Sequence, residues 1–222
     1  MSWLDTTLAV LVKDLRTEAR ARSAVGSVLL FSVVTLTAVS YSLGGFAIDA
    51  DIQASMLWIV LLFAALAGLS RGFVSETESG TVLALRLAAP PTSVYLGKFL
   101  FNLLLLGVLD LILIPLFQIL LPVASANWGL LMIGLVLGSI GLAASTTLIA
   151  AIVAQAGVKG TLFTVLAFPV LVPVLVAGIG ATRKAFASEP VAAAMPEIQL
   201  LVSYAGVMLA ASLLLFDHVW KD

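Results

Sequence analysis

The sequence predicts an all-α membrane protein with six transmembrane helices, an N-terminal interfacial helix and a short cytoplasmic helix. Of its 222 residues, 62% are hydrophobic and 10% are charged, whereas a soluble domain carries roughly a quarter charged residues. The mean hydropathy is +1.19. Six apolar stretches have the length of about 20 residues that a helical span requires. They are 24–43, 52–70, 97–121, 128–154, 160–181 and 198–217.

Composition excludes several classes of function. Connections between the six stretches are short, so residues 1–222 are predicted to form a single transmembrane domain with no separate soluble domain. The absence of cysteine excludes disulfides, thiolate metal sites and cysteine nucleophiles. A net charge of −1 gives no electrostatic footprint for nucleic acid. No catalytic residue and no metal site are predicted.

The distribution of Lys and Arg predicts the orientation in the membrane. Nine of the eleven basic residues fall in connections on one side, and only Arg183 and Lys184 fall on the other. Cytoplasmic loops carry the excess of Lys and Arg. Both termini and the 70–98 segment are therefore expected in the cytoplasm, and Arg183 and Lys184 depart from the rule.

The N-terminal segment, residues 2–22, has leucines at helical spacing and charges at other positions. One helical face carries Leu4, Leu8, Leu11 and Leu15, and the basic residues occupy other positions. This pattern is typical of a helix that lies in the membrane interface and contacts lipids with its apolar face. The alternative is a plain solvated leader before the first span. The basic residues follow most of the apolar positions instead of preceding them, and no cleavage site occurs, so a signal peptide is not predicted.

The third span carries one acid, Asp110, near the middle of the membrane. Intramembrane acids are costly and are functional by default. Apart from Lys98 at the very start of the third span, no Lys or Arg lies within a span, so Asp110 is expected to be protonated and to bond a Ser, Thr, Asn or carbonyl group of a neighbouring helix. A conduit role and a helix-packing role both remain open.

In the fourth span, small residues recur on one helical face. They are Gly134, Gly138, Gly141 and Ser145. Such a face allows the backbone of another helix to approach closely. The partner is either a second copy of the chain, in a homodimer or conduit seam, or the chain's own helices.

Two prolines one turn apart, Pro169 and Pro173, predict a kink in the fifth span. The kink leaves carbonyl groups that neighbouring side chains or water must satisfy. After this span, residues 182–197 combine charges with a run of small residues between Pro190 and Pro196. We expect this outer connection to hold a short re-entrant helix.

The segment between the second and third spans, residues 70–93, is polar and contains signals for the start and the end of a helix. Ser75 and Glu78 have the spacing of a capping box, in which each side chain satisfies an amide at the start of a helix. Gly80 interrupts within one turn, so the helical body is expected from Thr81 to Ala89, and Pro90 with Pro91 ends it. Residues 75–91 are thus predicted to form a short, stiff helix on the cytoplasmic face. Such a helix transmits force to the adjoining spans, although an ordinary capped loop has the same pattern.

Two other features could carry chemistry. Gly68–Gly72 matches the G-x-S-x-G pattern of serine hydrolases, with Ser70 as nucleophile, but that motif requires a strand-turn-helix elbow. We interpret these residues instead as the point where the second span leaves the membrane. His218 could ligate haem iron, but its position near Trp220 and Lys221 favours an interfacial anchor.

Several stretches carry a resemblance to a known family. The order of Glu76, Gly80, Pro90 and Lys98 in FVSETESGTVLALRLAAPPTSVYLGKF resembles the cytoplasmic segment of ABC export permeases that lack a fused ATPase. LRTEARARS and GVKGTLFTVLAFPVLVPVLVAG are similar to one branch of that group, the cytochrome c maturation permeases CcmB, or haem exporter protein B. The resemblance covers nearly the whole chain.

The resemblance implies six spans in the bacterial inner membrane, a homodimer and a separate CcmA-like ATPase subunit. No P-loop sequence occurs in the chain, so ATP is expected to be bound by that partner. It implies that hydrolysis drives haem export or the release of a haem chaperone, together with other maturation membrane proteins. Haem is then a possible cargo, and no cofactor is bound directly.

The residues expected to couple to the ATPase lie in and beside the short helix. They are Glu76, Glu78, Gly80, Leu83, Arg86, Pro90 and Lys98. Three alternatives stay open: an exporter of lipid, drug or polysaccharide, a non-transporting assembly scaffold, and an intramembrane hydrolase.

Overall fold

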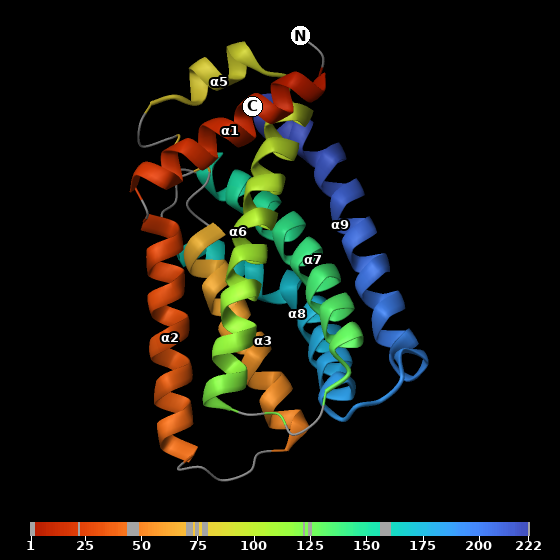
Figure 1. Ribbon diagram of the computed structural model, residues 1–222. Coiled ribbons are helices and arrows are strands. Elements are labelled where there is room, and N and C mark those ends of the chain that lie inside the picture. The colour runs from red at the N-terminus through yellow and green to blue at the C-terminus, as the bar shows by residue number, and fades with distance from the viewer. Residues whose placement is uncertain are drawn as a thin grey trace.

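The computed structural model shows an elongated helical bundle (Figure 1). It describes residues 3–21, 23–43, 49–69, 73, 76, 80–121, 123, 126–155 and 161–221. Within these residues no strand occurs. The elements are α1 (Trp3–Ala21), α2 (Ser23–Leu43), α3 (Ala50–Leu69), α5 (Val82–Ala88), α6 (Pro91–Leu120), α7 (Trp128–Gln155), α8 (Thr161–Phe186), the 3-10 helix η1 (Val191–Ala194) and α9 (Met195–Lys221).

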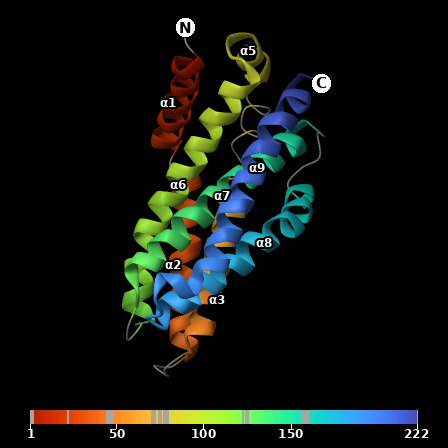
Figure 2. The same cartoon turned by 90° about the vertical axis from the view of Figure 1, so that its right-hand side faces the viewer.

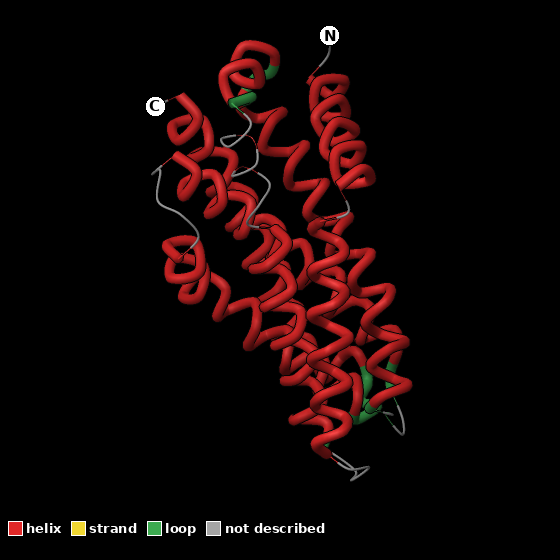
Figure 3. Tube along the Cα trace, turned by 90° about the vertical axis from the view of Figure 1, so that its left-hand side faces the viewer, coloured by secondary structure: helices red, strands yellow, loops and turns green. Residues whose placement is uncertain are grey.

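The long helices run lengthwise, and α1 and α5 lie at one end of the bundle together with both chain termini (Figure 1). The loops of described residues, green in Figure 3, lie toward the two ends of the bundle. The all-α class predicted from composition is confirmed. Because apolar helices of this length satisfy every backbone group internally, they suit a bilayer.

In the described part of the chain, five helices are long and apolar enough to cross a membrane. They are Ala50–Leu69, Pro91–Leu120, Trp128–Gln155, Val165–Phe186 and Val191–Trp220. In α2 the apolar stretch is shorter, from Val28 to Ser42. A sixth span, formed by α2, therefore stays a prediction.

The centre of the bundle is built around Trp58 of α3. Its ring fills a slot in which a Cβ atom at Gly138 would lie 2.1 Å, and one at Gly178 2.3 Å, from the nearest ring carbon. Its Nε1 donates a hydrogen bond of 2.8 Å to Oγ1 of Thr182. Glycine at both positions is thus required for α3, α7 and α8 to meet.

The small-residue face of α7 packs against other helices of the same chain. Trp58 covers Gly138, and a Cβ atom at Gly134 would contact Ala181 at 3.5 Å. A Cβ atom at Gly141 would lie 3.0 Å from the Tyr204 ring of α9. The Ser145 hydroxyl lies 2.7 Å from the Tyr204 hydroxyl. Within the chain this face packs against the chain's own helices, and a homodimer seam involving it stays a prediction.

In α8, Pro169 and Pro173 lie inside a helix that changes direction along its length (Figure 2). The Tyr204 hydroxyl donates to the carbonyl of Val170, between the two prolines, at 2.7 Å. A side chain of α9 thus contacts the backbone between the two prolines.

The outer connection 182–197 contains one short helix, and its predicted re-entry into the membrane stays a prediction. Residues up to Phe186 continue α8, and α9 begins at Met195. Between them lies only η1, which starts after the N-cap Pro190. Pro196 sits in the first turn of α9, where the missing N–H costs nothing. The second proline therefore begins a long helix instead of closing a short one.

Candidate functional site

A polar site lies where α1, α5 and the first turns of α6 meet, at the end of the bundle that carries both termini (Figure 1). Its acids and bases come from α1, from the described residue Glu76, and from α6. Several residues predicted from the sequence meet here, although the chain separates them widely.

The short helix α5 is shorter than the predicted 75–91. It spans Val82–Ala88, with Thr81 as N-cap and Ala89 as C-cap. Gly80 adopts a left-handed conformation, with φ of 69°, which glycine permits and which stops a helix running through from residue 75. Pro90 is the N-cap of α6 and belongs to that helix. Ser75 and Glu78, the predicted capping box, lie outside the described residues.

The two sides of α5 differ. Leu83 is 70% exposed and Leu87 is 90% exposed, and none of the residues of α5 is buried. Val82 and Leu85 pack partly against the core on the other side. Arg86 is half-buried, with its guanidinium 5.5 Å from the Trp220 ring of α9. Helix α5 thus presents an apolar outer surface while resting on the bundle.

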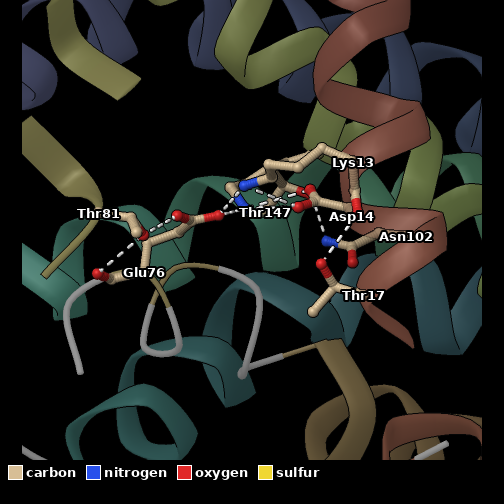
Figure 4. A network of polar contacts seen from close by, with 8 residues as sticks. Lys13, Asp14, Thr17, Glu76, Thr81, Asn102 and Thr147 are labelled. Carbon is tan, nitrogen blue, oxygen red and sulfur yellow. Dashed lines mark hydrogen bonds and ion pairs between the residues drawn. The ribbon is translucent and has the colours of Figure 1, made fainter. Parts of the chain in front are cut away.

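Glu76 is the centre of the polar site (Figure 4). Its side chain is buried, at 7% exposure. Its carboxylate accepts a 3.2 Å hydrogen bond from Lys98 and further bonds from Lys13 and the Thr81 hydroxyl. Its backbone carbonyl accepts from the amide of Thr81 at 3.0 Å. Glu76 therefore holds the start of α5 through both its side chain and its backbone.

Lys98 on α6 joins the two acids of the site. It is only 2% exposed, and its Nζ lies 3.2 Å from the nearest oxygen of Glu76 and 3.2 Å from Oδ2 of Asp14. Lys13 also contacts Asp14, at 3.1 Å. Two lysines thus balance two carboxylates, so the cluster is neutral. A buried charge is stable only with such partners.

The electrostatics shift two pKa values. Burial raises the pKa of Glu76, but the charge of Lys98 and the bonds from Lys13 and Thr81 outweigh burial and lower it to about 2. Burial lowers the pKa of Lys13, and the nearby Glu76 and Asp14 overcome this and raise it. Both groups are therefore held in their charged forms at neutral pH.

Helix α1 is packed onto the start of α6 by backbone approach. A Cβ atom at Gly97 would lie 2.7 Å from Val10 and 3.0 Å from the carbonyl of Thr7. The Ser93 hydroxyl donates to the carbonyl of Trp3 at 3.1 Å. Asn102, one turn beyond Lys98, donates to Thr147 of α7 at 2.8 Å (Figure 4). The site is thus anchored to the bundle.

Lys13 and Asp14 were not among the predicted site residues. Their adjacency on an amphipathic helix indicates a solvated or headgroup-facing surface, and the sequence gives no sign of their partners 63 and 84 residues away. One sequence signal for a separate role was present, because Lys13 and Asp14 lie on a different helical face from Leu4, Leu8 and Leu15. The structure shows these three leucines exposed.

Asp110 lies apart from this site, within α6. Ser139 of α7 donates a hydrogen bond of 2.8 Å to its Oδ2, which is the kind of hydroxyl partner that the sequence predicts. Its Oδ1 is buried without a hydrogen-bond partner. This arrangement joins two helices; the structure shows no ion pair to Asp110 from the described residues.

The two basic residues at the opposite end are both paired. Arg183 lies 3.4 Å from Asp51 of α3, and Lys184 lies 2.7 Å from Glu197 of α9. Lys184 also donates to the carbonyl of Ala193 at 2.8 Å. These partners neutralise the charges that depart from the orientation rule.

Other candidate chemistry gains no support from the structure. Ser70, the serine of the G-x-S-x-G match, lies outside the described residues. His218 is exposed on α9, with Nδ1 3.3 Å from the carbonyl of Leu214. Among the described residues, no group of three His, Asp or Glu side chains could hold a metal ion.

Comparisons with known proteins agree with the resemblance in the sequence. The family described as CcmB protein matches residues 5–221. Heme exporter protein B of Rhodobacter capsulatus is 32% identical over 178 residues, which cover 79% of this chain and 82% of that protein. Heme exporter protein B of Paracoccus denitrificans is 29% identical over 189 residues, covering 83% and 86%.

Proposed function

The chain belongs to the CcmB protein family, and from that premise we propose that it is the membrane subunit of an ABC-type transporter acting in cytochrome c maturation. A separate CcmA-like subunit hydrolyses ATP and presses on α5, and the motion shifts the spans. The cargo is haem or a haem-loaded chaperone, in keeping with the name heme exporter protein B that both relatives carry.

One observation carries the coupling role. Helix α5 offers Leu83 and Leu87 outward, one turn apart, while Glu76 ties its start to α1 and α6. Exposed apolar residues at i and i+4 are the anchors by which one helix docks into a groove of a partner. A docked helix that is also fixed at its base transmits displacement, whereas a loose loop absorbs it.

The arrangement in the membrane is part of the proposal. We assign α2 as the sixth span and α1 as a helix in the cytoplasmic interface, with Leu4, Leu8 and Leu15 toward the lipid. The end that carries both termini and α5 then faces the cytoplasm of a bacterial inner membrane. Residues 1–222 act as one domain, and two copies assemble with the ATPase and with other maturation membrane proteins.

The test is co-purification of the chain with the ATPase subunit from membranes. Leu83→Glu and Leu87→Glu place a charge in the docking surface, so each should lower the amount of bound ATPase at least tenfold, which corresponds to about 1.4 kcal/mol. Val191→Glu adds the same charge at the opposite end and should leave binding unchanged. Full ATPase binding in both leucine variants would refute docking on α5.

A further inference from the structure

The contact between Arg86 and Trp220 is a second attachment of α5 to the bundle. Glu76 fixes the start of α5 through directional bonds to Thr81. Near its other end, the Arg86 guanidinium lies over the Trp220 ring of α9 at 5.5 Å. Trp220 is only 5% exposed, so the ring forms a floor beneath α5.

Trp220 belongs to an aromatic cluster that links three parts of the chain. Its ring stacks on Phe216 at 5.4 Å, and Phe216 contacts Tyr95 of α6 at 5.5 Å. Phe73, from the segment before α5, contacts Trp220 at 5.9 Å. Lys98 lies 5.1 Å above the Phe73 ring. The polar site and the aromatic cluster therefore share one side chain, Lys98.

The contact has a specific physical character. In the described part of the chain, Nε of Arg86 and Nε1 of Trp220 are both buried and have no hydrogen-bond partner. Buried donors without acceptors disfavour the arrangement that leaves them so. Arg86 is then held by the attraction of its guanidinium to the face of the Trp220 ring. A displacement of α5 that carries Arg86 with it therefore acts on α9 through this ring contact.

We propose that Arg86 on Trp220 is a positioning contact that carries displacement of α5 into α9, in parallel with the route through Glu76 and Lys98 into α6. This rests on the proposed function, in which a partner ATPase moves α5. Helix α9 passes the motion on, because Tyr204 bonds both Ser145 of α7 and Val170 of α8. The contact thus couples α5 to the helices that form the centre of the bundle.

The absence of cysteine in the chain allows the two routes to be followed separately. One reporter is His218→Cys on α9, and the other is Leu104→Cys on α6; both positions are exposed. Each is labelled with an environment-sensitive fluorophore in the reconstituted complex with the ATPase. The signal is the fluorescence change on adding ATP.

In the native background, we expect both reporters to respond. Trp220→Leu keeps an apolar side chain but removes the ring face, so the response at position 218 should be lost and that at position 104 kept. Arg86→Met should act in the same way. Trp220→Phe keeps a ring face and should restore the response, and Trp128→Leu is the matched control at the opposite end.

The outcomes separate the two proposals. An unchanged response at position 218 in Trp220→Leu and Arg86→Met would overturn the Arg86–Trp220 route and leave the lever function standing. Loss at both positions in these variants would also overturn it, since the route through Glu76 is intact. No response at either reporter in the native background would refute both proposals.

Discussion

The neutral cluster around Glu76 makes a quantitative prediction for Glu76→Gln. A tenfold change in a protonation equilibrium is worth about 1.4 kcal/mol, and the pKa of Glu76 is lowered from 4.5 to about 2. Its ionised form therefore stabilises the folded chain by about 3 kcal/mol at neutral pH. The general cost of breaking a buried ion pair on one side, about 3–5 kcal/mol, agrees with this figure.

The assay is chemical denaturation in detergent micelles, followed by circular dichroism. At pH 7, Glu76→Gln should lower the free energy of unfolding by about 3 kcal/mol. The control is Asp51→Asn, which breaks the exposed 3.4 Å pair with Arg183 and should cost less than about 1 kcal/mol. An equal cost in the two variants would refute the role of buried charge at Glu76.

The sign of the pH dependence is fixed by the direction of the shift. A lowered pKa gives stability that is present above pH 4.5 and lost as pH falls to about 2. The difference between Glu76→Gln and the native chain should therefore vanish near pH 2. A difference that persists there would mean that packing, and not charge, is responsible.

Three further predictions concern stability, each measured by the same denaturation. Lys98→Met leaves the cluster with an excess negative charge, and combining it with Glu76→Gln restores neutrality. The double variant should therefore lose at least about 1 kcal/mol less free energy of unfolding than the sum of the two single losses. Additive losses would contradict the cluster. Gly138→Ala forces a methyl group into the Trp58 ring and should cost about 1–3 kcal/mol, whereas Gly107→Ala, which meets nothing within 4 Å, should be neutral or stabilising. Ser139→Ala removes the hydrogen bond to Asp110 and should lower the free energy of unfolding by about 1–3 kcal/mol. Asp110→Asn keeps an acceptor for Ser139 and should cost less. A larger cost for Asp110→Asn than for Ser139→Ala would show that Asp110 is not held by Ser139.

Local sequence patterns determined much of the fold. Apolar runs of span length predicted the long helices because a membrane helix satisfies its own backbone hydrogen bonds. The expected helical body, Thr81–Ala89, matches α5 to within one residue at each end, because left-handed backbone at Gly80 and proline both stop a helix locally, although the predicted segment 75–91 was longer. The order of Glu76, Gly80, Pro90 and Lys98 also carried the family resemblance that the CcmB match bears out.

Contacts between distant parts of the chain were decided only by the tertiary structure. The proline pattern did not reveal that Pro196 opens α9, because a proline suits either side of a helix boundary. The glycines of α7 predicted a close neighbour but not Trp58, since a small side chain does not specify what fills the space beside it. In the same way, Lys13 and Asp14 gained their role from Glu76 and Lys98: charge neutrality in a buried cluster depends on distances in space, which spacing along the chain does not encode.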